Sequence, residues 1–229
     1  MKKIFWISMM LVFALAACEK EEIIEDDNNI INVNYLPLAV GNYWVYDCYS
    51  IDKVSGKKFL FGNDSIIVRR DTIVNGKTYY ALTRWSMTET YPYLETLLRD
   101  SSGYIVNLSG KTLLSFTNFT DTLSRYDRLD HSSAIKVDSL YWTVPTIYTL
   151  TYKMEDAESI NVPLGTFEAV NCKGTFIVTD QYNIQNLPNP RYMDTYYADG
   201  VGKILEQAAY IESLTILERR LVSYSVKPY

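Results

Sequence analysis

A catalytic serine or cysteine usually needs a histidine beside it as general base, and histidine is scarce in this chain of 229 residues. His131 is the only histidine, and it stands in a polar Asp-His-Ser-Ser segment that is typical of a loop. A catalytic triad also needs an activated serine, and the sequence contains no Gly-x-Ser-x-Gly elbow. We therefore expect no catalytic residue and predict that the protein is not an enzyme.

Carboxylates are the other groups that could do acid and base chemistry. A glycosidase needs two of them about 5–10 Å apart, and the chain has 27 acidic residues from which a fold could assemble such a pair. Solvated surface charge is the interpretation we prefer. Histidine and cysteine lack the spacing of a zinc site, and no EF-hand or phosphate-binding loop is present, so we expect no metal and no cofactor. The candidate carboxylates are Asp64, Asp71, Glu95, Asp127 and Asp194.

Cys48 and Cys172 are the two cysteines that follow Cys18. In an oxidising compartment they could form a disulfide. On a strand, however, Cys48 would share a face with Trp44 and Tyr46, and a buried thiol behaves as a small apolar group. We expect two free buried thiols, with the disulfide as the alternative.

Tyrosine is unusually frequent, at 20 residues. Its flat ring and hydroxyl suit stacking on a ligand or packing against a partner. Aromatic residues are also favoured on half-buried sheet faces, which is the explanation we prefer. The candidate ligand-stacking residues are Tyr91, Tyr93, Tyr141, Trp142, Tyr196 and Tyr197.

Runs of β-branched and aromatic residues, bounded by turn residues, predict β-strands. These strands would have to position the side chains of any site. Two polar stretches, 118–133 and 180–192, are predicted as loops, and no long amphipathic helix is indicated. The predicted strands are 43–51, 65–74, 77–86, 94–99, 104–108, 112–116, 134–144, 146–154, 158–162, 167–179, 194–198, 203–209 and 214–226.

Turn signals between these runs predict consecutive hairpins. Asn75-Gly76 is the sharpest, because both residues tolerate the positive φ of a type I′ turn. Ser102-Gly103 and Ser109-Gly110 mark two more hairpins. The predicted fold class is all-β: an antiparallel meander that forms an open or half-closed barrel, with a β-sandwich as the alternative.

The first 17 residues have the pattern of an export leader. Lys2 and Lys3 precede an apolar run that is too short to span a bilayer, and small residues precede Cys18. Residues 18–35 are acidic and rich in Asn, which predicts a disordered tether. Residues 36–229 should then form a single domain. It keeps 19 of the 22 basic and 21 of the 27 acidic residues, and this balance gives no drive toward nucleic acid.

Leu15-Ala16-Ala17-Cys18 resembles the lipobox of bacterial lipoproteins. The resemblance implies that the Cys18 thiol carries acyl chains such as palmitate and anchors the protein in the outer membrane. The following Lys20-Glu21-Glu22 is similar to the export signal of Bacteroidetes-type lipoproteins that reach the cell surface. A periplasmic location is the alternative.

Four segments, 36–46, 71–80, 162–169 and 196–202, resemble uncharacterised lipoproteins of Bacteroidetes. Within them, Gly-Thr-Phe-Glu-Ala and Tyr-Ala-x-Gly-Val-Gly are similar to elements of periplasmic domains of unknown function. Those domains form an incomplete antiparallel barrel. The resemblance implies a fold and transfers no activity.

Together these patterns predict a lipid-anchored, non-catalytic envelope lipoprotein whose β domain binds a glycan, a lipid or an envelope protein. One alternative is a structural or assembly accessory, such as a lipid or lipoprotein carrier. Another is a carboxylate-dependent glycoside hydrolase. The shape and lining of the largest concavity would discriminate among the three.

Overall fold

The structure is a computed structural model that describes residues 33–86, 93–137, 140–179, 189–209 and 214–227. These residues belong to one compact unit that begins at Val33. In this part of the chain, no helix is long and apolar enough to cross a membrane. The predicted leader and the residues Cys18, Lys20, Glu21 and Glu22 lie outside the described residues.

Thirteen strands make up the described part of the chain, and every pairing between them is antiparallel. They are β1 (Tyr43–Asp52), β2 (Lys58–Val74), β3 (Lys77–Ser86), β4 (Tyr93–Asp100), β5 (Tyr104–Asn107), β6 (Thr112–Ser115), β7 (Thr122–Val137), β8 (Leu140–Val162), β9 (Gly165–Thr179), β10 (Arg191–Met193), β11 (Thr195–Ala198), β12 (Gly202–Ala209) and β13 (Thr215–Ser225).

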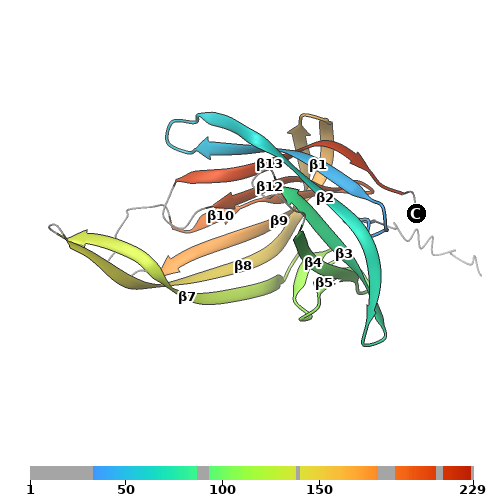
Figure 1. Cartoon of the computed structure of the whole chain (residues 1–229), viewed down its shortest axis with the longest axis horizontal. Helices are drawn as coiled ribbons and strands as arrows, with labels where there is room; N and C mark the ends of the chain where they lie inside the picture. The colour runs from blue at the N-terminus through green and yellow to red at the C-terminus, as the bar shows by residue number, and fades with distance from the viewer. Residues whose placement is uncertain (1–32, 87–92, 138–139, 180–188, 210–213, 228–229) are drawn as a thin grey trace, which may run out of the picture. The chain divides into compact units, whose positions relative to one another are not determined.

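The strands form one sheet in the order β6-β5-β4-β3-β2-β1-β13-β12-β11-β9-β8-β7, with β10 paired to β9. Two meanders are thus joined where the first strand pairs with the last (Figure 1). The outermost strands β6 and β7 approach each other without pairing in this order. The sheet is therefore nearly closed into a barrel with one unsealed seam, which confirms the predicted fold class.

The predicted hairpin turns are confirmed. Asn75 and Gly76 have φ values of 51° and 72°, and Ile73 pairs with Thr78 across the turn. Tyr79 pairs with Thr72, one step further from the turn. Positive φ at Ser102-Gly103 and at Gly110 marks the two other hairpins.

The predicted loop over 118–133 is wrong from Thr122 onward, because β7 pairs along its length with β8. His131 therefore lies in a strand. The polar residues of this stretch do not prevent strand formation, since a strand beside the seam has a neighbour on one side only.

Two predicted strand boundaries are also wrong. A single strand over 134–144 is replaced by the end of β7 at Val137 and the start of β8 at Leu140, which pair with each other. The predicted break between 154 and 158 is only a register shift within β8, because a bulge accommodates extra residues without ending a strand. Of the predicted loop 180–192, Arg191 and Tyr192 belong to β10, and residues 180–188 lie outside the described part.

The core lies on the inner face of the sheet. Trp44, Tyr46 and Cys48 alternate along β1 and are each at most 3% exposed. Trp44 Nε1 donates a hydrogen bond to Val201 O at 2.6 Å, and Tyr46 Oη donates to Lys203 O at 2.9 Å. These bonds let large aromatic side chains enter the core with their polar atoms satisfied.

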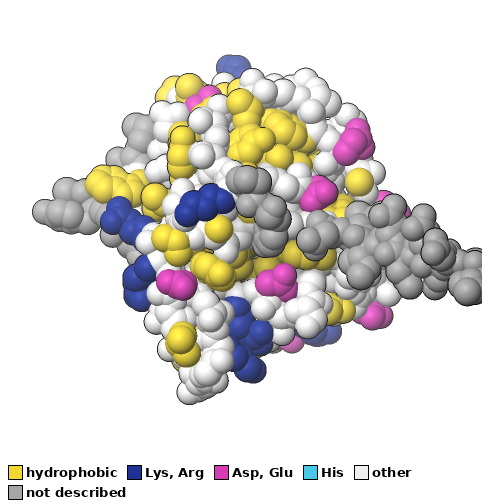
Figure 2. Space-filling view, turned by 90° about the vertical axis from the view of Figure 1, so that its right-hand side faces the viewer, with side chains coloured by type: hydrophobic (Ala, Val, Ile, Leu, Met, Phe, Trp, Pro, Cys, Tyr) yellow, Lys and Arg dark blue, Asp and Glu magenta, His cyan; other side chains and the backbone are white. Residues whose placement is uncertain are grey.

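The entry of the chain into the domain is tied down before the predicted start at residue 36. The backbone N–H of Asn34 donates to Asp199 Oδ1 at 2.7 Å, and Tyr35 packs edge-on against Phe116. On the surface shown in Figure 2, side chains of both charge signs are scattered. This distribution agrees with the near-neutral charge balance of the domain.

Candidate functional site

Polar side chains take the place of apolar ones in one part of the inner face. They come from β2, β3, β12 and β13, and strand register brings them together. Asp64 on β2 lies opposite Ser86 on β3, while Arg219 on β13 lies between Cys48 on β1 and Glu206 on β12. Because inward positions alternate along every strand, a few matched registers suffice to gather these groups.

A network of charged hydrogen bonds joins these side chains. Asp64 Oδ2 accepts from Nε and Nη2 of Arg84 at 3.1 and 2.7 Å, and from Arg219 Nε at 2.7 Å. Glu206 Oε2 accepts from Arg219 Nη1 at 2.6 Å and from Lys203 Nζ at 3.0 Å. Three cations thus hold two carboxylates in a partly buried position, where salt screens them little.

Glu218 forms a second charged cluster on the opposite face of β13, since it pairs with Tyr49 and Gln207 whereas Arg219 pairs with Cys48 and Glu206. Its side chain is 3% exposed, and Lys58 Nζ lies 3.6 Å from Oε1. Arg220 Nε donates to the same oxygen, and Gln207 Nε2 donates to Oε2 at 2.8 Å. Burial alone would raise the pKa of Glu218, but these partners outweigh burial and lower it. Glu218 is therefore ionised at neutral pH.

A pocket of about 410 Å³ opens beside the first network and includes Glu218 of the second in its lining. This volume is typical of small-molecule sites. Arg84 and Arg219 each keep 19% of their side-chain surface exposed, against 5% for Asp64. The pocket therefore presents guanidinium groups more than carboxylate. Its lining residues are Cys48, Ser50, Phe61, Asp64, Arg84, Ser86, Leu217, Glu218 and Arg219.

A second cavity, of about 130 Å³, lies deeper in the core. Trp44, Tyr46, Leu82 and Leu98 are among its mostly apolar lining residues, and Lys203 contributes the one charged side chain. Its volume is below the roughly 300 Å³ at which small-molecule sites begin. The larger pocket is therefore the better candidate site.

Glu206 should make stability depend on pH. Burial alone would raise its pKa, but Lys203 and Arg219 outweigh burial and lower the pKa from 4.5 to about 2. A carboxyl whose pKa is lower in the folded state contributes stability that is present above pH 4.5 and is lost as the pH falls toward 2. We expect Glu206→Gln to lower the free energy of unfolding by about 2–3 kcal/mol at pH 7.

The measurement for Glu206 is urea denaturation at pH 7, 4.5 and 3. The gap between the variant and the wild type should narrow at each step. Glu168→Gln, at an exposed position on β9, should follow the wild-type curve at every pH. A Glu206→Gln deficit that stays constant down to pH 3 would mean that the ionised carboxylate does not carry the effect.

Both cysteines predicted as buried thiols are free and buried in the structure. Desolvation, followed by the charge of Asp64, raises the pKa of Cys48 to about 11. Desolvation raises the pKa of Cys172 to about 12, and its thiol donates to Leu113 O at 3.4 Å. Both thiols are therefore protonated at neutral pH, which makes them poor nucleophiles.

The predicted stacking residues do not form a common platform among the described side chains. Tyr196 Oη donates to Glu158 Oε1 at 2.7 Å, and burial followed by this bond raises its pKa. Tyr197 instead lines the smaller cavity. The side chains of Tyr91, Tyr93, Tyr141 and Trp142 lie outside the described residues.

A row of three aromatic rings crosses β7, β8 and β9. The ring centroids are 6.4 Å apart between Tyr126 and Tyr148 and 5.2 Å apart between Tyr148 and Phe176. Tyr126 is 43% exposed, but Tyr148 and Phe176 are buried. The row therefore packs the sheet and offers one ring to a ligand.

Among the candidate carboxylates, Asp64 is the one that lines the pocket. Asp127 pairs with Arg125 on the surface, and Asp194 accepts from Asn171 Nδ2 at 2.8 Å. The side chains of Glu95 and His131 lie outside the described residues. Where side chains are described, no cluster of three or more His, Cys, Asp and Glu residues could hold a metal ion.

Sequence reasoning missed Arg84, Glu206, Glu218 and Arg219. An inward-facing charge on a strand looks like a surface charge until the neighbouring strands are known. One signal could have found Arg84: on β3 it has the same parity as Leu82, which is buried.

The fold and site thus define an open antiparallel β-barrel with a charged internal pocket. No protein-family model matches the sequence, and none of the curated proteins matches it. One similar crystal structure is that of a Bacteroides fragilis protein described as exported, with a YmcC-like fold. It is 13% identical, with a TM-score of 0.37, and the match covers 84% of this chain and 99% of that one.

A second similar crystal structure is that of a Parabacteroides distasonis protein described as a lipoprotein. It is also 13% identical, with a TM-score of 0.40, and the match covers 84% of this chain and 99% of that one. Neither similarity is close enough to place the chain in a family.

Proposed function

We propose that the chain is an exported, lipid-anchored binding protein, whose β domain takes a small ligand into the 410 Å³ pocket without turning it over. The observation that carries this proposal is the pocket itself. Its floor is an ion-pair network in which Asp64 is held by two arginines. Preassembled polar groups in a concave site lower the cost of binding.

The protonation states around the pocket favour binding over catalysis. A general acid at neutral pH needs a carboxyl whose pKa is raised, but Glu206 and Glu218 have lowered pKa values. A nucleophilic thiol needs a lowered pKa, but the pKa of Cys48 is raised. These shifts support the proposal that the protein is not an enzyme.

The carrier alternative has less support. A carrier of acyl chains needs an open cavity whose lining is apolar throughout, whereas the 410 Å³ pocket has charged side chains, Asp64, Arg84 and Arg219, on its floor. The more apolar cavity holds only about 130 Å³. We therefore place the binding role first.

The proposed location is the outer membrane, with lipid on Cys18 and with Lys20, Glu21 and Glu22 directing the protein to the cell surface. The leader and lipobox support the first part of this proposal, and the Lys-Glu-Glu resemblance supports the second. Several acyl chains would be needed for a lasting anchor, because one chain gives only marginal binding.

The anchor is tested by Cys18→Ala. The variant should keep its leader and should incorporate no label when cells are fed radioactive palmitate, because the acylated thiol is gone. The measurement is label per protein on a gel, with Cys48→Ala as the matched cysteine control. Equal labelling of Cys18→Ala and the wild type would remove the lipid anchor from the proposal.

The pocket is tested with a panel of organic acids, phosphates, sugars, alcohols and amines on residues 19–229, which contain the whole sheet and core. A ligand at 100 times its Kd should raise the melting temperature by about 5–10 °C. Ser50→Trp, which fills the pocket from β1, should abolish that rise. Ser223→Trp, at an exposed position on β13, should keep it.

Product analysis of the same mixtures completes the test. We expect every bound compound to be recovered unchanged. Release of product by the wild type but not by Ser50→Trp would replace the binding role with an enzymatic one. A panel in which no compound raises the melting temperature would contradict a small-molecule pocket and favour the accessory role.

A further inference from the structure

We propose that the pocket binds an organic anion, with its carboxylate or phosphate on Arg84 and Arg219 and an apolar body against Phe61 and Leu217. This inference rests on the proposed binding function and adds the chemical class of the ligand. The geometry that points to it is a charged floor next to an aromatic mouth.

Guanidinium groups are the more exposed part of the first network where it lines the pocket. Arg84 and Arg219 both bind the carboxylate of Asp64, and each keeps more of its side chain exposed than Asp64 does. The partly buried position screens these charges little from an incoming group. An anion would therefore be attracted to these guanidinium groups, whereas a cation would be repelled by them.

The second network is close to neutral. The buried carboxylate of Glu218 and the nearby carboxylate of Asp47 face the cations of Arg220 and Lys58. Although Glu218 lines the pocket, these cations and Gln207 already occupy its oxygens. Glu218 thus leaves little free carboxylate with which to repel an anion.

Hydrogen-bond donors are available on the floor. Nε and Nη1 of Arg219 donate to Asp64 and Glu206, which leaves Nη2 without an acceptor in the described part of the chain. Arg219 and Arg84 keep 19% of their side chains exposed, whereas Asp64 keeps 5%. Guanidinium groups bind carboxylate and phosphate through charge-assisted bonds, often two at a time.

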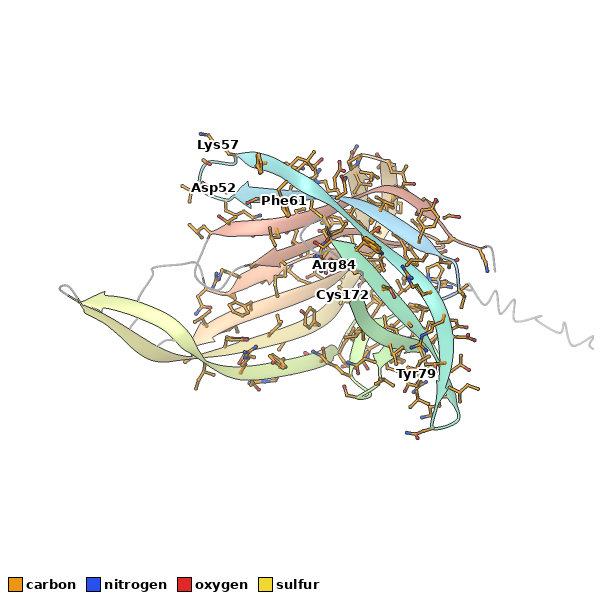
Figure 3. All side chains as sticks on the ribbon, viewed as in Figure 1. Asp52, Lys57, Phe61, Tyr79, Arg84 and Cys172 are labelled. Atoms are coloured by element: carbon orange, nitrogen blue, oxygen red, sulfur yellow. The ribbon has the colours of Figure 1, made fainter. Side chains whose placement is uncertain are left out.

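The mouth of the pocket is apolar. Phe61 is 39% exposed and lines the pocket together with Leu217. Phe59 is 67% exposed and lies opposite Ser50, another lining residue. Figure 3 shows Phe61 between the end of the β1–β2 hairpin, marked by Asp52 and Lys57, and Arg84. An apolar body attached to the anion would cover these exposed rings.

The test is isothermal titration calorimetry of residues 19–229 at neutral pH with four compounds that share one chain: octanoate, octyl phosphate, octanol and octyltrimethylammonium. Octanoate or octyl phosphate should bind at least roughly tenfold more tightly than octanol and octyltrimethylammonium, because only an anion can accept the charge-assisted bonds. The tighter of the two anions identifies the headgroup as carboxylate or phosphate.

Two variants assign the parts of the pocket. Arg84→Lys keeps the positive charge but removes the planar guanidinium that can donate two parallel hydrogen bonds. It should weaken the binding of the tighter anion by roughly tenfold. Arg125→Lys, at an exposed arginine of β7, should leave the affinity unchanged. Phe61→Ser, at a partly exposed position that tolerates a polar residue, should also weaken the anion. It keeps the test decisive if Arg84→Lys unfolds.

The outcomes separate this inference from the proposed function. If octanol or octyltrimethylammonium binds as tightly as the anions and Ser50→Trp abolishes that binding, the pocket is a binding site but the anion inference is wrong. If neither these compounds nor the wider panel binds, both proposals are wrong. Anion binding that is unaffected by Arg84→Lys and Phe61→Ser would place the anion elsewhere and overturn the inference.

Discussion

Replacing Asp64 with Asn should lower the free energy of unfolding by about 3–5 kcal/mol, because the change removes the buried carboxylate that Arg84 and Arg219 share. Asp64 is 4% exposed, and its Oδ2 atom accepts from both Arg84 and Arg219. Asn has nearly the same shape but no charge, so the two guanidinium groups would repel each other across it. Urea denaturation of residues 19–229 at pH 7 measures the loss.

The matched control for Asp64→Asn is Asp127→Asn. Asp127 also pairs with an arginine, at 2.9 Å, but its side chain is 51% exposed and that of Arg125 is 64% exposed. Solvent and salt screen such a pair, so we expect little measurable change in stability. Equal losses in the two variants would show that the buried network does not stabilise the native domain.

Replacing Gly202 with Ala should lower the free energy of unfolding by about 3–5 kcal/mol, through backbone strain and overpacking together. Gly202 has φ +106°, and an added Cβ would lie 2.8 Å from Trp44 Nε1 and 3.1 Å from Cε2. Trp44 cannot easily move away. It is 2% exposed, and its Nε1 is held by Val201 O at 2.6 Å.

Gly200→Ala separates strain from overpacking. Gly200 also has positive φ, at +66°, but an added Cβ would meet nothing within 4 Å. We expect this variant to lose only about 1–2 kcal/mol, the cost of the left-handed conformation. The two unfolding curves should therefore differ clearly in midpoint. A Gly202→Ala loss no larger than that of Gly200→Ala would show that the contact with Trp44 is not tight.

Local patterns in the sequence were sufficient to predict the class of the fold. The alternation that predicted the buried face of β1 places Trp44, Tyr46 and Cys48 in the core. Asn75-Gly76 predicted its hairpin because few other residue pairs tolerate positive φ at both positions. Such signals are reliable because they depend on the conformations open to two or three neighbouring residues.

The local patterns were misleading where tertiary pairing overrides local preference. The polar stretch after Asn118 resembled a loop, yet from Thr122 it is strand β7. Its backbone groups pair with β8, and the free energy of that pairing does not depend on apolar side chains on both faces. The predicted break between residues 154 and 158 is wrong for the same reason. Strand β8 continues there through a bulge between Glu155 and Glu158.

By itself, the sequence determined the all-β class, the hairpin turns and the burial of Cys48, since each follows from alternation or from backbone preferences within a few residues. Only the tertiary structure decided the site. Asp64 and Arg219 are 155 residues apart along the chain and share a hydrogen bond because β1 pairs with both β2 and β13. That pairing joins the two ends of the chain, and no local signal encodes which strands become neighbours. The charges of the pocket therefore look like ordinary surface charges until the sheet closes around them.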